Sequence, residues 1–269
     1  MAITTPIYVY GNSWLHQLDP RVKLLFAVGG MATMLTLGNL PVFLAFLVVC
    51  HVLLLSAGVP ASRLAWAWRL MLPITILIPV LWPIFSTAGS SVLLRLGPIT
   101  ATTLDVWQGL AMAARVDAMA FAFFVWLFTT DQESMVAGLV GLGIPYEWGL
   151  VVAISLRYVP TLYESFQQVL DAQRARGLVI PRSNPAKAAR SYVPALVATL
   201  IGALRTAEHL SWALQVRAFG AAGRQRTIRR ELRFRPADGV AAAVMVLGFG
   251  AVIAARVLFG FGQLPLSLL

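Results

Sequence analysis

Five long apolar runs, separated by short polar or charged connections, dominate the chain. They cover roughly residues 22–38, 41–57, 69–87, 106–128 and 237–260. A helix needs about 20 predominantly apolar residues to cross a bilayer, so each run predicts a membrane-spanning helix. The first two are short for this purpose, and Gly38-Asn39-Leu40-Pro41 between them predicts a tight turn. The third contains Pro73, Pro79 and Pro83, where we expect kinks.

Between the fourth and fifth runs the pattern becomes amphipathic. From Thr161 to Arg176, and again from Ala195 to Arg217, apolar residues recur at the spacing of one helix face. Both segments carry ionisable residues, so we expect them to lie along or below the membrane surface. The first half of the second segment is apolar enough to enter the bilayer.

The two amphipathic segments repeat one motif. Each follows Tyr-Val-Pro (158–160 and 192–194) and ends in Ala, three residues, Arg and a small residue (172–177 and 213–218). The openings lie 34 residues apart and the closings 41. The difference is about two helical turns, which keeps the terminal Arg on a similar face of a longer helix. Pro160 is expected to bend or break its helix, and so is Pro194.

Residues that favour helix ends mark further boundaries. Asp19 is suited to cap a helix that starts at Pro20. Thr130 and Glu133 fit a capping box for a short helix that ends before Gly143.

Composition places the chain among membrane proteins. Hydrophobic residues make up 59% and charged residues 12%, whereas soluble domains carry about 25% charged residues. The mean hydropathy is +0.78. Together with the five runs, this predicts an all-α, polytopic membrane protein.

Charge asymmetry orients the predicted spans. Cytoplasmic loops are enriched in Lys and Arg, and Arg21 with Lys23 before the first run predicts a cytoplasmic N-terminus. Residues 131–235 hold 14 of the 21 Lys and Arg residues, so the net charge of +10 is a topology signal and does not indicate nucleic acid. We expect an N-terminal bundle of four spans, a cytoplasmic helical region and a C-terminal span, covering residues 1–130, 131–235 and 236–269.

Few residues suggest chemistry at a site. Arg115 and Asp117 lie inside the fourth run, and residues two apart do not face each other on a helix, so each is expected to pair elsewhere in the bundle. His51 and His209 are isolated and Cys50 is the one cysteine, so no metal site is expected. The sequence lacks a Gly-rich phosphate motif and a nucleophile–base arrangement, so we expect neither catalysis nor a directly bound cofactor.

Arg176 and Arg217 allow two interpretations. A cation followed by a small residue can simply end a helix. Alternatively, both are docking tips, because a guanidinium donates several hydrogen bonds at once to an acidic or carbonyl-lined groove. Their recurrence with Tyr-Val-Pro upstream favours docking.

Six segments carry a resemblance to a known family: His16–Lys23, Thr129–Asp131, Leu142–Pro145, Leu156–Pro160, Ala172–Gly177 and Arg217. The chain resembles the transmembrane T component of energy-coupling factor (ECF) transporters, the vitamin and metal importers of prokaryotes. In that family two coupling helices end in Ala-Arg-Gly-like motifs that dock into ATP-binding-cassette (ABC) subunits. Ala175-Arg176-Gly177 matches fully, while the second copy reads Val216-Arg217-Ala218.

The resemblance implies site roles and partners. The six residues of the two tips would dock ATPases. Arg157, Tyr158, Pro160, Tyr192 and Pro194 would support the coupling helices, and Asp19, Pro20, Arg21 and Lys23 would form the membrane-entry motif. Expected partners are two ABC ATPase subunits, identical or different, one membrane substrate-binding (S) subunit and the bilayer of a prokaryotic cell membrane. ATP and Mg would bind to the ATPases. Which vitamin or metal is imported, and whether the module is dedicated or shared, stay open.

Two other classes stay open on the residues alone. A secondary transporter would repeat its spanning segments around midplane binding groups, whereas this repeat lies in the amphipathic helices. An integral membrane enzyme would need clustered catalytic groups, which three scattered His residues and one Cys do not supply.

Overall fold

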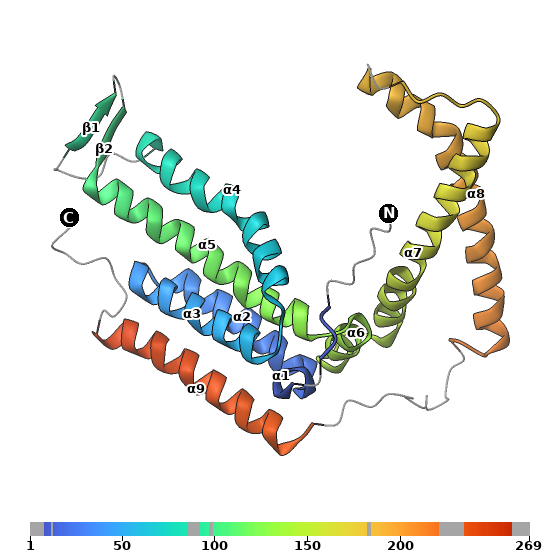
Figure 1. The fold of residues 1–269 in the computed structure, drawn as a ribbon. Helices are drawn as coiled ribbons and strands as arrows, with labels where there is room; N and C mark the ends of the chain where they lie inside the picture. Colours follow the sequence, from blue (N-terminus) through green and yellow to red (C-terminus); the bar gives the residue numbers. More distant parts are fainter. Residues whose placement is uncertain are drawn as a thin grey trace. The chain divides into compact units, whose positions relative to one another are not determined.

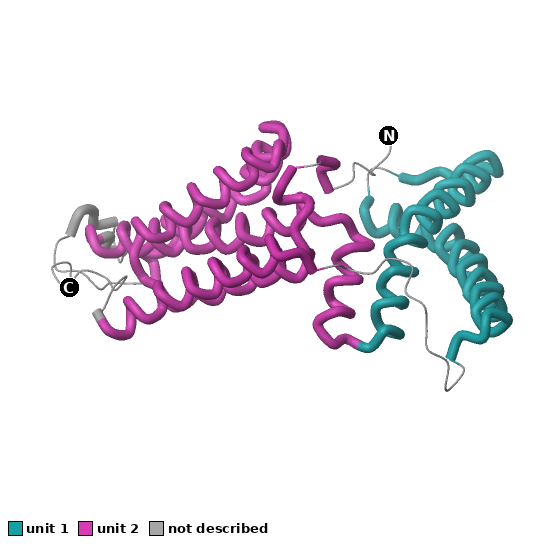
Figure 2. Tube along the Cα trace, turned by 90° about the horizontal axis from the view of Figure 1, so that it is seen from below, with its two compact units in different colours: residues 1–4, 145–231 teal, residues 5–144, 232–269 magenta. Residues whose placement is uncertain are grey.

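A computed structural model of the protein describes residues 8–11, 13–85, 92–96, 99–181, 184–220 and 234–259. These residues form two compact units, which Figure 2 colours separately. The bundle unit comprises residues 5–144 and 232–269, and the two-helix unit comprises residues 1–4 and 145–231. Apart from one short hairpin, the regular structure is helical, which confirms the all-α class.

The elements follow the apolar and amphipathic runs closely. In the bundle unit they are α1 (Trp14–Gln17), α2 (Pro20–Thr36), α3 (Leu40–Ser56), α4 (Ala61–Phe85), β1 (Val92–Leu96), β2 (Ile99–Thr102), α5 (Thr103–Thr129), α6 (Gln132–Gly141) and α9 (Pro236–Phe259). The two-helix unit contains α7 (Tyr146–Ala175) and α8 (Pro185–Val216). Strands β1 and β2 pair antiparallel. The bundle unit includes α6 and reaches residue 144, because α6 packs against α2.

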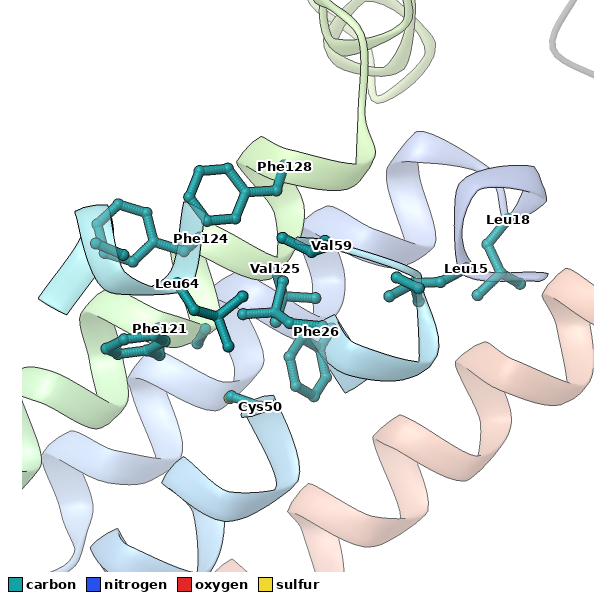
Figure 3. Close-up of a cluster of buried hydrophobic side chains, with 14 residues drawn as sticks. Leu15, Leu18, Phe26, Cys50, Val59, Leu64, Phe121, Phe124, Val125 and Phe128 are labelled. Carbon is teal, nitrogen blue, oxygen red and sulfur yellow. The ribbon is translucent and has the colours of Figure 1, made fainter. Parts of the chain in front are cut away.

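Helix α5 is the centre of the bundle unit. It packs against α2, α3 and α4, and Figure 1 shows these helices side by side. Phe121, Phe124 and Phe128 of α5 pack with Phe26 of α2 and Leu64 of α4 in the main buried cluster (Figure 3). The rings of Phe124 and Phe128 stack with centroids 5.4 Å apart. Large side chains therefore fill the core near the C-terminal half of α5.

The N-terminal half of α5 packs through small side chains. Ala111, Ala114 and Ala118 are buried against Met34 of α2 and Phe43 of α3. Small residues let helix backbones approach closely. Such close contact favours packing in a membrane, because surrounding lipid removes the hydrophobic driving force for helix association.

Local capping sets the starts of two bundle helices. The Asp19 carboxylate accepts the Arg21 backbone N–H at 2.8 Å, and Pro20 is the first residue of α2, as predicted. At α5 the Thr102 hydroxyl accepts the Asp105 N–H at 3.2 Å, and the Asp105 carboxylate accepts the Thr102 N–H at 3.0 Å. This capping box begins α5 ahead of the predicted run.

The predicted cap of α6 is wrong. Asp131, not Thr130, accepts the Ser134 N–H, at 3.3 Å. Thr130 is the residue that ends α5, so the next residue is left to start α6. Gly143 follows the end of α6 with φ +107°, as its place in the sequence predicted.

Among the residues that the structure describes, three helices are long and apolar enough to cross a membrane. They are α4, α5 and residues 236–258 of α9, while α3 is apolar but has 17 residues. Helix α2 also has 17 residues, which span about 26 Å at 1.5 Å per residue. The first two of the five spans expected from the sequence thus coincide with helices near the lower length limit. Helix α4 continues through its three prolines, and Figure 1 shows it as a curved helix.

Helices α4 and α5 approach each other closely at Gly109. A Cβ on Gly109 would lie 3.0 Å from the Cα of Pro79 and 3.0 Å from the Cβ of Trp82. These neighbours include backbone, which cannot rotate away. We therefore expect Gly109→Ala to lower the free energy of unfolding by about 1–3 kcal/mol, measured by thermal unfolding in detergent with Trp fluorescence.

Gly248→Ala on α9 is the matched control, since a Cβ there meets nothing within 4 Å. Because alanine has a higher helix propensity than glycine, Gly248→Ala should not lower the stability. Equal melting temperatures for the wild type and Gly109→Ala would contradict this α4–α5 contact.

Candidate functional site

Helices α7 and α8 of the two-helix unit cross each other (Figure 1). The rings of Phe166 on α7 and Tyr192 on α8 lie 6.4 Å apart at their centroids. About one turn further along each helix, Leu170 and Ala195 are buried. The crossing is therefore held by a local apolar contact.

Of the two outcomes expected at Pro160 and Pro194, a bend or a break, the structure excludes the break. Helix α7 continues across Pro160 and α8 across Pro194, over 30 and 32 residues. A proline removes one intrahelical hydrogen bond, which leaves the rest of a long helix intact. Figure 1 shows α8 changing direction along its length, so the expected bend is present in α8.

The predicted supporting residues are spread along the helices. Arg157 and both prolines are exposed, and Tyr158 and Tyr192 are half-buried. Tyr192 contributes to the crossing, while the described ring contacts do not join it to Tyr158. Their supporting role stays a prediction.

The first tip ends α7 in a Schellman motif. Ala175 is the last residue of α7, Arg176 is its C-cap, and Gly177 follows with φ +95°. The Gly177 N–H donates to the Arg174 carbonyl at 2.9 Å, and the Leu178 N–H donates to the Gln173 carbonyl at 3.0 Å. These bonds satisfy carbonyl groups that the helix end would otherwise leave unpaired.

The second tip ends α8 in the same motif. The Ala218 N–H donates to the Gln215 carbonyl at 2.9 Å, and the Phe219 N–H donates to the Leu214 carbonyl at 2.9 Å. Ala218 takes the place of Gly177 with φ +56° and is the one described non-glycine residue with a positive φ. The two tips therefore share one backbone geometry despite their different sequences.

The guanidinium groups of both tips are exposed and make no polar contact within the described residues. Arg176 and Arg217 are exposed, and Val216 beside the second is 88% exposed. In the described part of the chain neither guanidinium has a hydrogen bond or ion pair, whereas nearby Arg174 pairs with Asp171 at 3.0 Å. Because the Schellman bonds already satisfy the helix ends, each Arg side chain can donate all its N–H groups to a partner.

A buried polar cluster at the start of α2, here called the Lys23 junction, was not expected from the sequence. The Lys23 ammonium, on a residue only 3% exposed, donates to the Thr129 carbonyl at 2.8 Å and the His16 carbonyl at 3.1 Å. The Asp19 backbone N–H donates to a carboxylate oxygen of Asp238 at 2.8 Å. Thus the membrane-entry motif meets the end of α5 and the start of α9.

Arg21, the other cation of that motif, lies against α6. Its guanidinium covers Gly141. A Cβ on Gly138 would lie 3.1 Å from the Cβ of Pro20. Two glycines therefore let α6 approach the first turn of α2.

His16 ties the N-terminal segment to the bundle. Its Nε2 donates to the Val9 carbonyl at 2.9 Å, and its Nδ1 accepts the Ser13 hydroxyl at 2.7 Å. Burial lowers the pKa of His16, which suits this neutral ring. The Val9 N–H donates to the Phe128 carbonyl at 3.0 Å.

The two charges inside α5 find separate partners, as the sequence predicted. Arg115 donates to the Leu37 carbonyl at the end of α2, and its guanidinium lies 5.3 Å from the centroid of the Phe43 ring. Asp117 accepts the Thr75 hydroxyl at 2.9 Å. Both contacts join α5 to its neighbours.

Comparison with known proteins shows to which protein family the chain belongs. A model of the cobalt transport protein family, CbiQ, matches residues 11–228. The chain belongs to the CbiQ family. The match includes both tips and the first turn of α2 and ends before α9.

Curated relatives of this CbiQ-family protein extend the likeness over most of the chain. The relative in Listeria innocua is 32% identical over 241 residues, covering 86% of this chain and 89% of its own. That of Brevibacillus brevis is 32% identical, covering 89% and 93%. That of Leuconostoc gelidum is 30% identical, covering 89% and 91%. All three are named energy-coupling factor transporter transmembrane protein EcfT, which confirms the likeness to the ECF T component.

Ala218 adopts a left-handed conformation that costs a residue with a Cβ roughly 1–2 kcal/mol. Ala218→Gly should remove this cost and slow hydrogen exchange at the Phe219 amide, measured by mass spectrometry of peptides covering residues 213–220. Ala207→Gly, inside the same helix, is the control and should speed exchange around it, since glycine weakens a helix interior. Faster exchange in Ala218→Gly would contradict the Schellman geometry of the second tip.

Proposed function

We propose that this CbiQ-family protein is the energy-coupling subunit of an ECF importer in a prokaryotic cell membrane. It links ATP binding and hydrolysis on two ABC ATPase subunits to a membrane substrate-binding subunit. The observation that carries the proposal is the pair of exposed Arg tips with one shared backbone geometry. Two equivalent tips suit the two equivalent grooves of an ATPase dimer.

The division of labour follows from the chemistry of the chain. ATP and Mg are bound by the ATPases, and this subunit transmits movement without catalysing a reaction. Each tip ends a helix of 30 or 32 residues, about 45 Å long at 1.5 Å per residue. ATPases that bind the tips differently with and without ATP therefore bias the crossed helices between two arrangements, which move the substrate-binding subunit.

The substrate belongs to one of two classes. The family description names cobalt transport, which supports a transition-metal ion. The likeness to the ECF group supports a vitamin equally. The substrate-binding subunit makes this choice.

The docking role is tested by Arg176→Glu combined with Arg217→Glu. Reversing a charge in a carbonyl-lined or acidic groove should cost roughly 2–5 kcal/mol at each tip, so ATPase subunits should no longer co-purify in detergent. Arg205→Glu, an equal charge change at another exposed position of α8, is the control and should keep them. Full ATPase recovery with the double variant would refute docking through the tips.

Orientation is tested separately. Arg21 and Lys23 support a cytoplasmic N-terminus, and the charge of residues 131–235 supports a cytoplasmic two-helix unit. In a Cys50→Ala background, a membrane-impermeant maleimide should label Thr103→Cys in intact cells and Lys187→Cys only in inverted vesicles. Labelling of Lys187→Cys in intact cells would reverse the proposed orientation.

A further inference from the structure

The Lys23 junction holds charge where water is excluded. A buried ammonium is costly unless its donors are satisfied and opposite charge is near. Two of its three N–H groups donate to the His16 and Thr129 carbonyls. The carboxylates of Asp131, Asp19 and Asp238 are close enough to stabilise the charged form. Taking one partner away would leave the charge buried and poorly compensated, so the junction resists separation.

Asp238 is the matching anchor on α9. It is 2% exposed, and its two carboxylate oxygens bind different parts of the chain. One accepts the Asp19 N–H at 2.8 Å, and the other accepts the Arg235 N–H at 2.7 Å, at the start of α9. A single side chain therefore ties the start of α9 to the cap of α2.

These anchors coincide with the chain connections between the two units. The chain leaves α5 at Thr129, enters α6 with Asp131 as its cap, and passes into the two-helix unit at Pro145. It returns to the bundle unit at residue 232 and begins α9 close to Asp238. Lys23 binds the end of α5, after which the chain leaves for the two-helix unit. Asp238 lies at the start of α9, where the chain has returned, and binds Asp19. The end of α5 and the start of α9 are thus both bound to the first turn of α2.

Given the proposed function, on which this step rests, we propose that Lys23 and Asp238 are positioning residues for energy coupling. They fix the end of α5 and the start of α9 to the first turn of α2, and the chain leaves for the two-helix unit after α5 and returns from it before α9. Movement imposed on the Arg tips is thereby passed to the bundle unit. Without the junction, the end of α5 and the start of α9 move independently of α2. The tips then still dock, but the bundle responds much less to nucleotide.

The test uses the complex of the full chain with the ATPase and membrane subunits that co-purify with it. Hydrogen exchange is measured by mass spectrometry with and without the non-hydrolysable analogue AMP-PNP and Mg²⁺. In the wild type, nucleotide should change exchange at the tips and in the bundle unit. Lys23→Met and Asp238→Asn, which preserve side-chain size, should keep the tip response. They should reduce the bundle response by about fivefold or more, the lower end of usual coupling between sites.

Two further variants sharpen the result. Arg69→Met removes a cation from an exposed position of α4 and should keep both responses. Lys23→Met combined with Asp238→Asn should be no worse than either change alone, because residues acting through one junction are not additive.

Three results would overturn the inference. The first is a bundle response that survives in both single variants. The second is the absence of a bundle response in the wild type. The third is loss of the assembled complex in both variants, which would make the junction purely structural. Failure of the proposed function is distinct, since the wild-type chain would then recover no ATPase subunits.

Discussion

A lysine ammonium inside a helix bundle has to be surrounded by acceptors and negative charge, and this requirement organises the start of α2 in the bundle unit. Lys23 obtains its acceptors from the end of α5 and from α1, the short helix before α2. The neighbouring cap residue, Asp19, is bound by Asp238 from the start of α9. Segments more than 200 residues apart along the chain thus meet at the first turn of α2, where the buried Lys23 ammonium and the buried Asp19 N–H both require partners.

Along most of the other helix contacts in the bundle unit, the packing of apolar side chains decides the arrangement. Helices gain little from hydrophobic burial against one another when lipid surrounds them, so close contact decides their packing. Alanines and Gly109 let α5 meet three neighbours, and phenylalanines fill the wider half of the core. The outward faces stay apolar, as at Val240 and Leu247 of α9, which suits lipid.

The two Arg tips show how one backbone conformation arises from two sequences. Gly177 reaches the left-handed region without steric cost, whereas Ala218 reaches it against a local preference. The two Schellman hydrogen bonds at α8 stabilise that conformation. Because these bonds satisfy the helix ends, both Arg side chains are left for contacts outside the chain. The proposed docking of ATPase subunits uses that availability.

Features set by neighbouring residues could be predicted from the sequence: the apolar runs that form α2 to α5 and α9, the Asp19 cap, the turn at Gly143 and the Arg tips. Their signals are periodicity and local hydrogen bonding, which act within a few residues. The cap at Asp131 and the passage of α7 through Pro160 depend on where adjacent helices end and pack. Lys23 was recognisable as a topology signal, but its burial and its link through Asp19 to Asp238 were decided by the tertiary structure alone. A pairing across 219 residues leaves no local pattern, because it exists only once α2, α5 and α9 have packed together.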